Sequence, residues 1–178
     1  LCNTVAVIAM AHHLGLSFEA VRSALPGFKG VKRRQEIRGR KRGISVLDDF
    51  AHHPTAVRET LAAVRPAAPK GRLIAVFEPR TNSSMRDIFQ ADYARAFDAA
   101  DIICVRRPPL LEKIPPGQRF SSKRLVKDLT KRGKNAFYFP DTDAIIEFLV
   151  AGARPGDVVL IMSNGGFDNI HDRLLREL

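Results

Sequence analysis

Residues 157–167 read DVVLIMSNGGF, an apolar run followed by a polar turn with paired glycines. The run has the length and composition of a fully buried β-strand. Four earlier apolar runs have the same character, at residues 44–48, 72–77, 101–105 and 136–139. Strands that are apolar on both sides are typical of a sheet covered on both faces.

The segments between these runs have the apolar spacing of helices. Pro54 and Asp141 are suitable first-turn and capping residues for two of them. The expected helices lie at residues 54–65, 85–99, 122–132, 141–151 and 167–177. Alternating strands and helices predict an α/β fold, with a Rossmann-like, mainly parallel sheet and helices on both faces.

The first part of the chain has a different pattern. We expect two helices, at residues 3–14 and 17–25, the second capped by Ser17 and ended by Pro26 and Gly27. A hairpin is expected next, with arms at 31–39 and 44–47. The sequence begins with Leu1 in the middle of a pattern, so we expect a fragment of a longer protein.

Composition excludes several classes of protein. With 178 residues, 45% of them apolar, the chain is long enough for one domain with a buried core and too hydrophobic for a disordered segment. Its two cysteines, Cys2 and Cys104, do not form a disulfide framework or a zinc motif, which favours a reducing cytosol. No apolar run reaches the length of a membrane span.

The formal net charge of +10 is concentrated in two zones. Residues 29–42 carry eight basic and one acidic side chain, and residues 106–134 carry ten and two. Such zones favour an anionic partner, either nucleic acid, a nucleotide or a substrate with several carboxylates. A basic nucleic-acid-binding module is less well supported, because Phe28 and Phe120 are the only rings near the zones.

Three polar clusters follow predicted strands, which places them at the sheet edge where open α/β folds bind ligands. Their sequences are DDFAHHP at 48–54, EPRTNSSMR at 78–86 and SNGGFDN at 163–169. In the first cluster, the carboxylates and imidazoles could hold Mg²⁺, orient a ribose or move a proton. The simpler interpretation is that Asp49 caps the next helix and the histidines fill a crevice.

The other two clusters suit anions. Arg80 offers a planar fork for a carboxylate or phosphate, although it could instead pair with Glu78. Gly165 and Gly166 could present backbone N–H groups to an anion at a helix start, or could form an ordinary turn. The chain has no GxxxxGK[ST] loop, no GxGxxG fingerprint and no GxSxG elbow. The missing glycine fingerprint argues against a free-standing Rossmann dehydrogenase domain, and most of the machinery for binding a nucleotide triphosphate would have to lie elsewhere.

Four strings in a fixed order resemble one family. They are GVKRRQEIRG at 30–39, LDDFAHHPTAV at 47–57, FEPRTNSSM at 77–85 and MSNGGFDNIH at 162–171. Together they cover essentially the whole chain and resemble the carboxy-terminal part of a Mur ligase. The FEPR and MSNGGF strings favour the subfamily that joins UDP-N-acetylmuramate to the murein tripeptide L-alanyl-γ-D-glutamyl-meso-diaminopimelate. The alternative within the family is the UDP-N-acetylmuramate–L-alanine ligase.

This resemblance implies a domain organisation and a reaction. Residues 1–29 would be the end of a central ATPase domain, and residues 30–178 would be the carboxy-terminal domain. ATP and Mg²⁺ would be bound mostly by the central domain, with no metal ligand in this chain, so the fragment alone would be inactive. The partners would be UDP-N-acetylmuramate, the tripeptide and the upstream domains, without nucleic acid or membrane, in cytoplasmic peptidoglycan recycling.

The resemblance also implies roles for individual residues. Asn3 would be the last Asn of an HNxxN segment, Arg34 would lie on the ATP phosphates, and Asp49 would contact the nucleotide ribose. His52 would line the junction with the central domain as the catalytic residue. The residues expected to face the incoming peptide are Arg80, Asn82, Ser163, Asn164, Gly165 and Phe167. The DNPR string of diaminopimelate ligases is not reproduced, and residues 106–108 stand near its place.

Overall fold

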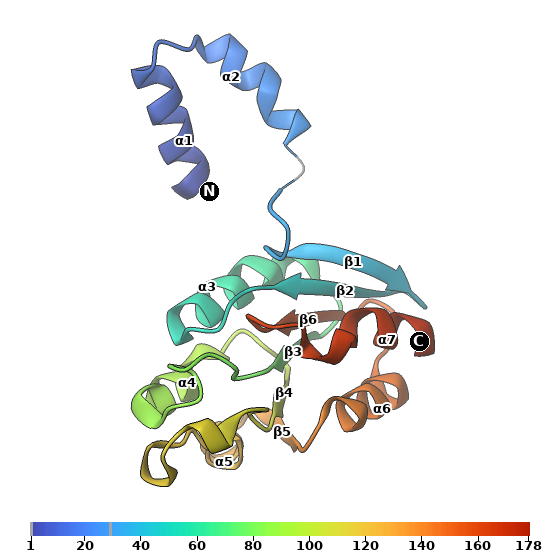
Figure 1. Cartoon of the computed structure of the whole chain (residues 1–178). Coiled ribbons are helices and arrows are strands. Elements are labelled where there is room, and N and C mark those ends of the chain that lie inside the picture. The colour runs from blue at the N-terminus through green and yellow to red at the C-terminus, as the bar shows by residue number, and fades with distance from the viewer. Residues whose placement is uncertain (1, 29) are drawn as a thin grey trace. The chain divides into compact units, whose positions relative to one another are not determined.

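The computed structural model describes residues 2–28 and 30–178, and the chain forms two compact units, Leu1–Lys32 and Arg33–Leu178. The smaller unit contains helices α1 (Cys2–His13) and α2 (Phe18–Ala24), as predicted (Figure 1). The Ser17 hydroxyl caps α2 by accepting a hydrogen bond from the Ala20 N–H at 3.2 Å. None of the helices in the described residues is long and apolar enough to cross a bilayer.

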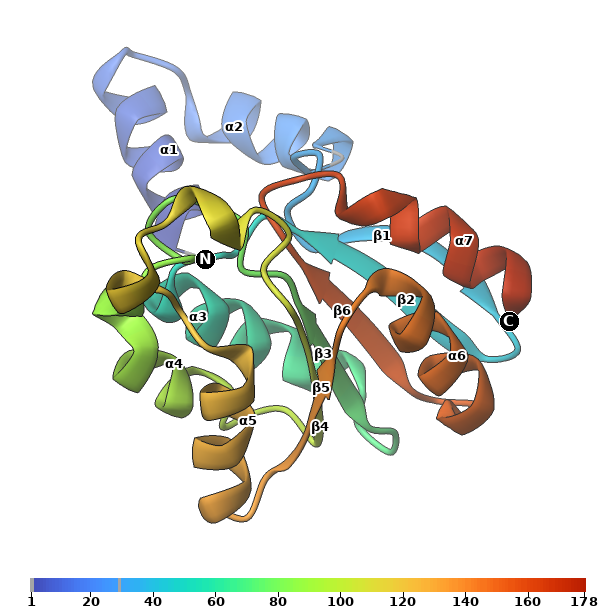
Figure 2. The same ribbon diagram turned by 60° about the horizontal axis from the view of Figure 1, so that its bottom comes forward.

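The larger unit is built on one six-stranded sheet with the order β1-β2-β6-β3-β4-β5 (Figure 2). Within this sheet β1 pairs with β2 in antiparallel orientation, and the other neighbouring strands are parallel. The strands are β1 (Glu36–Lys41), β2 (Ile44–Asp49), β3 (Leu73–Phe77), β4 (Ile102–Arg106), β5 (Asn135–Phe139) and β6 (Val158–Met162). The predicted Rossmann-like, mainly parallel sheet is confirmed.

Helices cover both faces of this sheet (Figures 1 and 2). Alternate side chains of β3 serve the two cores: Phe77 packs with Tyr93 and Phe97 on one face, and Val76 packs in the core on the other. The first core is covered by α3 (Pro54–Val64), α4 (Gln90–Ala96) and α5 (Ser122–Lys131), and the second by α6 (Thr142–Gly152) and α7 (Ile170–Glu177).

Three predicted elements begin three or more residues later than expected. The helix predicted from residue 85 starts at Gln90, because the Thr81 hydroxyl accepts the Ser84 N–H and holds the preceding segment in a turn. The helix predicted from 167 starts at Ile170, since residues 167–169 have φ of 46°, 49° and 54°. The first hairpin strand begins at Glu36 because residues 33 and 35 are also left-handed.

Asp157 stabilises the edge of the sheet where β3 and β6 begin, opposite to the edge that carries the polar clusters. Its side chain is buried and accepts hydrogen bonds from the Arg72 N–H at 3.1 Å, the Arg72 guanidinium at 2.6 Å and the Arg154 N–H at 2.9 Å. Burial tends to raise the pKa of Asp157, but these hydrogen bonds and the Arg72 charge lower it below its ordinary value. Asp157 therefore ties the starts of β3 and β6 together.

We predict that Asp157→Ala lowers the free energy of unfolding at pH 7 by about 2–3 kcal/mol, since charged hydrogen bonds are lost in a buried place. The folded-state pKa is depressed, so this contribution is present above the unfolded value of about 4 and disappears as the pH falls through the folded value. Urea unfolding of the chain between pH 7 and pH 3 measures both effects.

Asp143→Ala provides the matched control, because its ion pair with Arg173 is exposed. We expect it to cost less than about 1 kcal/mol. Equal losses for the two variants, or a loss at Asp157 that is independent of pH, would contradict the assignment.

Candidate functional site

Three strands end side by side with their polar clusters. The parallel register aligns Asp49 of β2 with Met162 of β6, and Met162 with Phe77 of β3. The alignment continues past the strand ends, because the Ser163 N–H donates to the Asp49 carbonyl and the Glu78 N–H donates to the Met162 carbonyl, both at 3.1 Å. The predicted convergence of the three clusters at one sheet edge is confirmed.

Glu78 is the buried anion at the centre of this edge. One of its carboxylate oxygens accepts the Ser163 hydroxyl at 2.7 Å, and the other pairs with the Arg106 guanidinium. Arg80 lies 3.7 Å from that second oxygen, which confirms the alternative that Arg80 pairs with Glu78. Because Glu78 is fully buried, these partners are what makes its charge tolerable.

Arg80 is also positioned by a glycine. A Cβ atom on Gly165 would lie 2.2 Å from Arg80 Cδ, so the arginine stem occupies the space that any side chain at 165 would need. About a third of the Arg80 side chain remains exposed, and its guanidinium therefore keeps access to solvent. Asn82 is exposed nearby and accepts a hydrogen bond from Arg86 Nε at 3.3 Å.

The turn at 163–167 has an internal support. The Ser163 hydroxyl accepts the Gly165 N–H at 2.9 Å, so this N–H is already used within the turn. Ser163 and Phe167 are buried and hold the turn from beneath, with Arg106 stacked 5.5 Å from the Phe167 ring. Contact with a peptide stays a prediction for this turn, and Asn164 Oδ1 is buried there without a hydrogen-bond partner among the described residues.

Asp49 serves the loop before β1. Its carboxylate accepts the Gln35 N–H at 2.9 Å and the Ala51 N–H at 2.8 Å, and it is almost fully buried. The interpretation of Asp49 as the cap of the following helix is wrong, because His53 caps α3 by accepting the Thr55 N–H. In this conformation Asp49 holds the backbone of Gln35 in place by accepting its N–H.

Asp48 points to the opposite face of β2, as neighbouring strand residues do. It lies 3.3 Å from Arg33 Nε, 3.8 Å from an Arg38 nitrogen and 3.4 Å from His171 Nε2. Burial alone would raise the pKa of Asp48. The neighbouring His171 ring and the two guanidinium groups outweigh that effect, and the pKa lies below its ordinary value.

Asp48 and Asp49 thus do not converge on one cation, since each is occupied on its own face of the strand. No group of three or more His, Cys, Asp or Glu side chains in residues 2–28 and 30–178 is placed to hold a metal ion. Cys104 is buried, and burial raises the pKa of its thiol, so it is not an active nucleophile.

Arg34 is one of the unpaired cations of the first basic zone among the described residues. Its guanidinium carbon lies 5.4 Å from the centre of the Phe50 ring, and its side chain makes no hydrogen bond or ion pair within the part of the chain that the structure describes. His52 is half-buried, with its Nδ1 2.9 Å from the Phe50 carbonyl and its ring edge-on to Phe50. The Asn3 side chain lies outside the described residues.

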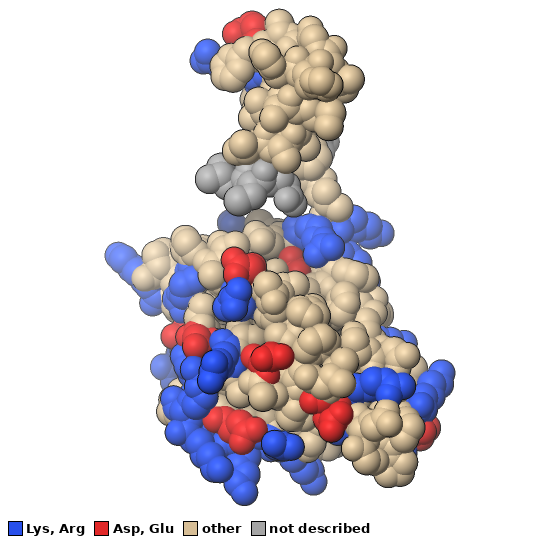
Figure 3. Space-filling view, turned by 90° about the vertical axis from the view of Figure 1, so that its left-hand side faces the viewer, with Lys and Arg blue, Asp and Glu red and all other residues tan. Residues whose placement is uncertain are grey.

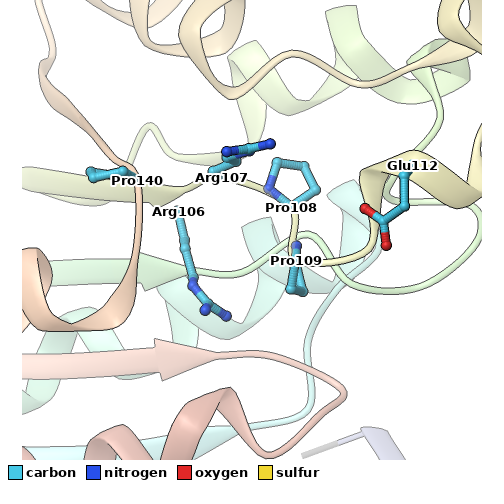
Figure 4. Close-up of a pocket in the computed structure, with 6 residues that line it drawn as sticks. All are labelled: Arg106, Arg107, Pro108, Pro109, Glu112 and Pro140. Atoms are coloured by element: carbon cyan, nitrogen blue, oxygen red, sulfur yellow. The ribbon is translucent and has the colours of Figure 1, made fainter.

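A small polar cavity follows the end of β4 (Figure 4). It has a volume of about 280 Å³ and is lined by Arg106, Arg107, Pro108, Pro109, Glu112 and Pro140. Figure 4 shows the Arg106 guanidinium pointing away from the Pro108 ring, in keeping with its pairs to Glu78 and Asp168. Arg106, the first cation of the second basic zone, is thus taken up by internal ion pairs.

The rest of that zone lies mostly on the surface of α5. Figure 3 shows Lys and Arg side chains gathered low on the face that carries α4 and α5. The exposed cations of this helix are Lys123, Arg124, Lys127 and Lys131. Acidic neighbours such as Asp98, which pairs with Arg132, divide the patch, and Lys123 lies over the Tyr138 ring.

Sequence reasoning missed Arg33 as a part of the site. Its guanidinium donates to the carbonyls of Ser163 and Gly165, which lie 130 or more positions away along the chain. The KRR run marks it as basic, but only the pairing of β2 with β6 brings the two segments together. Arg106, Asp168 and His171 were missed for the same reason.

Fold and site define an α/β domain that presents cations and a tight turn at the carboxyl edge of a parallel sheet. The chain matches the family model described as Mur ligase, glutamate ligase domain, over residues 33–165. The protein therefore belongs to the Mur ligase family, as its four strings predict.

Curated relatives carry two different names. The Escherichia coli UDP-N-acetylmuramate–L-alanyl-γ-D-glutamyl-meso-2,6-diaminoheptanedioate ligase is 38% identical, over 97% of this chain and 36% of its own length. The Synechococcus elongatus UDP-N-acetylmuramate–L-alanine ligase is 36% identical, over 98% of this chain and 38% of its own length. The chain thus spans little more than a third of either relative.

A solved structure has the same fold. The crystal structure of a murein peptide ligase from Psychrobacter arcticus superposes with a TM-score of 0.74 at 35% identity. The similarity covers 98% of this chain and 36% of that one.

Gly165→Ala should displace Arg80, because the new methyl group would occupy the position of the arginine stem. We expect the NMR signal of Arg80 Nε–Hε to shift and the free energy of unfolding to fall by about 1 kcal/mol. The measurement is a pair of ¹H–¹⁵N spectra with urea unfolding of the same samples.

Gly166→Ala is the matched control, since a Cβ there meets nothing within 4 Å and its φ of −77° is ordinary. It should leave both the Arg80 signal and the stability nearly unchanged. An Arg80 signal that moves equally in both variants would argue against specific packing on Gly165.

Proposed function

We propose that this chain is the carboxy-terminal part of an ATP-dependent ligase that joins UDP-N-acetylmuramate to L-alanyl-γ-D-glutamyl-meso-diaminopimelate. The reaction would belong to cytoplasmic peptidoglycan recycling. The main observation in support is that one sheet edge presents Arg34, which has no ion pair among the described residues, together with Arg80 and the turn at 163–167. The family membership and the name of the Escherichia coli relative support the same conclusion.

The chemistry requires cations on both sides of a reacting carboxyl group. A muramate carboxylate oxygen would attack the γ-phosphorus of ATP, forming an acyl phosphate and releasing ADP. The peptide amine would then attack the acyl carbon, phosphate would leave, and the amine would lose a proton as the amide forms. Phosphoryl transfer depends on positioned positive charge, and acyl phosphates must be kept from water.

Arg34 suits the nucleotide side of this reaction. It is exposed, it is free of ion pairs among the described residues, and the Phe50 ring limits its motion. We assign it to the ATP phosphates, with Asp49 holding the loop through the Gln35 N–H and thereby supporting the nucleotide site. His52 lies next to Phe50 and would line the closed site as the catalytic residue proposed from the resemblance.

Arg80 and Asn82 suit the peptide side. Both are at least partly exposed after β3, beside the turn that contains Asn164 and Gly165. A guanidinium fork and an amide are appropriate donors for the carboxylates of an acidic peptide. Ser163 and Phe167 would contribute by supporting the turn from below.

The upstream domains of the full-length protein would supply the residues that bind Mg²⁺ and the loop that binds the triphosphate. The described residues contain no group of carboxylates placed to hold Mg²⁺, and we assign the metal-binding residues of the ligase to the upstream domains. When bound, Mg²⁺ would neutralise phosphate charge. In this chain, Arg34 is suited to contact the triphosphate, because its guanidinium group has no ion-pair partner among the described residues and can make charged hydrogen bonds to phosphate oxygens.

The smaller unit fits the role of the end of an upstream ATPase domain that includes Asn3. Helices α1 and α2 enclose an apolar groove lined by residues that include Ile8, Leu16 and Phe18. Val5, Met10 and Leu14 are also largely exposed, an arrangement that one more layer of protein would bury. The fragment alone would lack ligase activity, because we assign the triphosphate loop and the metal-binding residues to upstream domains.

The L-alanine ligase is the second candidate, because the Synechococcus elongatus relative of that name is 36% identical. We prefer the tripeptide on the FEPR and MSNGGF strings and on the position of Arg80, which suits a substrate with several carboxylates.

We predict that the full-length protein releases phosphate from ATP in the presence of UDP-N-acetylmuramate and the tripeptide, and that L-alanine gives at most about 1% of that rate. A coupled phosphate assay with mass spectrometry of the product measures this. Activity with L-alanine alone would establish the second candidate, and no amide formation with either amine would refute both. The fragment is the negative control.

Arg34→Ala should raise the KM for ATP about tenfold or more and leave the KM for the tripeptide nearly unchanged, because it removes a charged hydrogen bond to phosphate. Arg80→Ala should do the reverse. Steady-state kinetics with each substrate varied in turn test the split. Arg42→Ala is the control, since this exposed cation lies in the β1–β2 turn, at the opposite end of β2 from Asp49. Equal effects of all three variants would contradict the division of roles.

A further inference from the structure

Arg33 joins three segments through one guanidinium group. Its Nη2 donates to the Ser163 carbonyl at 2.6 Å and to the Gly165 carbonyl at 2.8 Å, and its Nε donates to Asp48 at 3.3 Å. About a quarter of the side chain is exposed. The fork therefore links the loop before β1 to the end of β2 and to the turn after β6.

The backbone around Arg33 is held in an unusual conformation. Arg33 and Gln35 both have left-handed φ, 57° and 51°, which is uncommon for residues with side chains. The conformation persists because three backbone groups of this segment have fixed partners. Glu36 accepts the Arg33 N–H at 2.8 Å, the Arg33 carbonyl accepts the Phe50 N–H at 2.9 Å, and Asp49 accepts the Gln35 N–H.

Arg34 lies between these two fixed residues. Its neighbours on both sides are anchored, and its own guanidinium lies over the same Phe50 ring as that of Arg33, each at 5.4 Å from the ring centre. The position of Arg34 is thus set by the contacts of Arg33 and Gln35. The same Arg33 side chain sets the position of the carbonyls of the turn on which Arg80 packs.

Arg33 has fewer donors left for a phosphate than Arg34, since only its Nη1 makes no hydrogen bond among the described residues. Both hydrogens of Nη2 and the hydrogen of Nε are already used, and the Asp48 carboxylate compensates the charge. Arg34 has no such partners among the described residues.

We propose that Arg33 is a positioning residue that couples the nucleotide side of the site to the peptide side, by fastening the loop of Arg34 to the turn at 163–165. This inference rests on the proposed function, and it adds that the two substrates depend on one shared contact. Loss of that contact alters the binding of both substrates, whereas loss of Arg34 or Arg80 alters one.

Arg33→Met in the full-length protein tests the coupling, because methionine keeps part of the apolar stem and removes every donor. We expect the KM values for ATP and for the tripeptide to rise together, each by about threefold to tenfold, with kcat reduced about tenfold. In Arg33→Lys the ammonium group keeps a positive charge near Asp48 and a hydrogen bond to one of the turn carbonyls. Compared with the methionine variant, it should therefore recover part of the loss in both KM values. Should the methionine variant not fold, the lysine variant carries the test with the same joint change at smaller size.

Arg38→Met is the matched control. Arg38 reaches the same Asp48 at 3.8 Å and also Asp172 at 3.1 Å, but makes no hydrogen bond to the turn among the described residues. It should leave both KM values within about twofold of the wild type. Identical kinetics for the Arg33 and Arg38 variants, or an Arg33 effect on only one substrate, would overturn the coupling. An inactive wild-type protein would instead refute the proposed function, so the two failures are distinguishable.

Discussion

The parallel register of β2, β6 and β3 is the constraint on which the rest of the site depends. It aligns Asp49, Met162 and Phe77, and the backbone hydrogen bonds at 3.1 Å that continue past these residues bring Ser163 and Glu78 to the same level. A shift of one residue in any of these strands would turn its side chains to the opposite face and separate the clusters. Segments more than a hundred residues apart in the chain thereby become neighbours.

Buried carboxylates organise the cations that gather at this edge. Glu78 holds Arg106 and lies close to Arg80, while Asp48 holds Arg33 and lies near Arg38 and His171. Arg33 and Arg106, which make hydrogen bonds to these carboxylates, gain a fixed position, whereas Arg80 keeps about a third of its side chain exposed. Arg34 has no such partner among the described residues. The basic residues of the chain thus include internal ion pairs, an unpaired arginine in the site and an exposed face of α5.

Local patterns in the sequence were sufficient to predict the sheet, its helices and the meeting of the three clusters. Apolar runs such as 157–162 are typical of strands whose two faces are both covered by helices. The same reasoning could not find the contacts of Arg33, because its partners Ser163 and Gly165 become neighbours only through tertiary pairing. It also misplaced the start of the last helix, since residues 167–169 adopt a left-handed backbone, which is uncommon for any residue with a side chain, although Asp and Asn adopt it more readily than others.

The central claim is that this edge brings a nucleotide site and a peptide site together through Arg33. A crystal structure of the full-length protein with UDP-N-acetylmuramate and a non-hydrolysable ATP analogue tests it most directly. The account predicts the Arg34 guanidinium at about 3 Å from a phosphate oxygen, with Arg33 still bonded to the carbonyls of Ser163 and Gly165. A structure in which Arg33 leaves the turn to bind phosphate, or in which Arg34 remains on Phe50 away from the nucleotide, would contradict it.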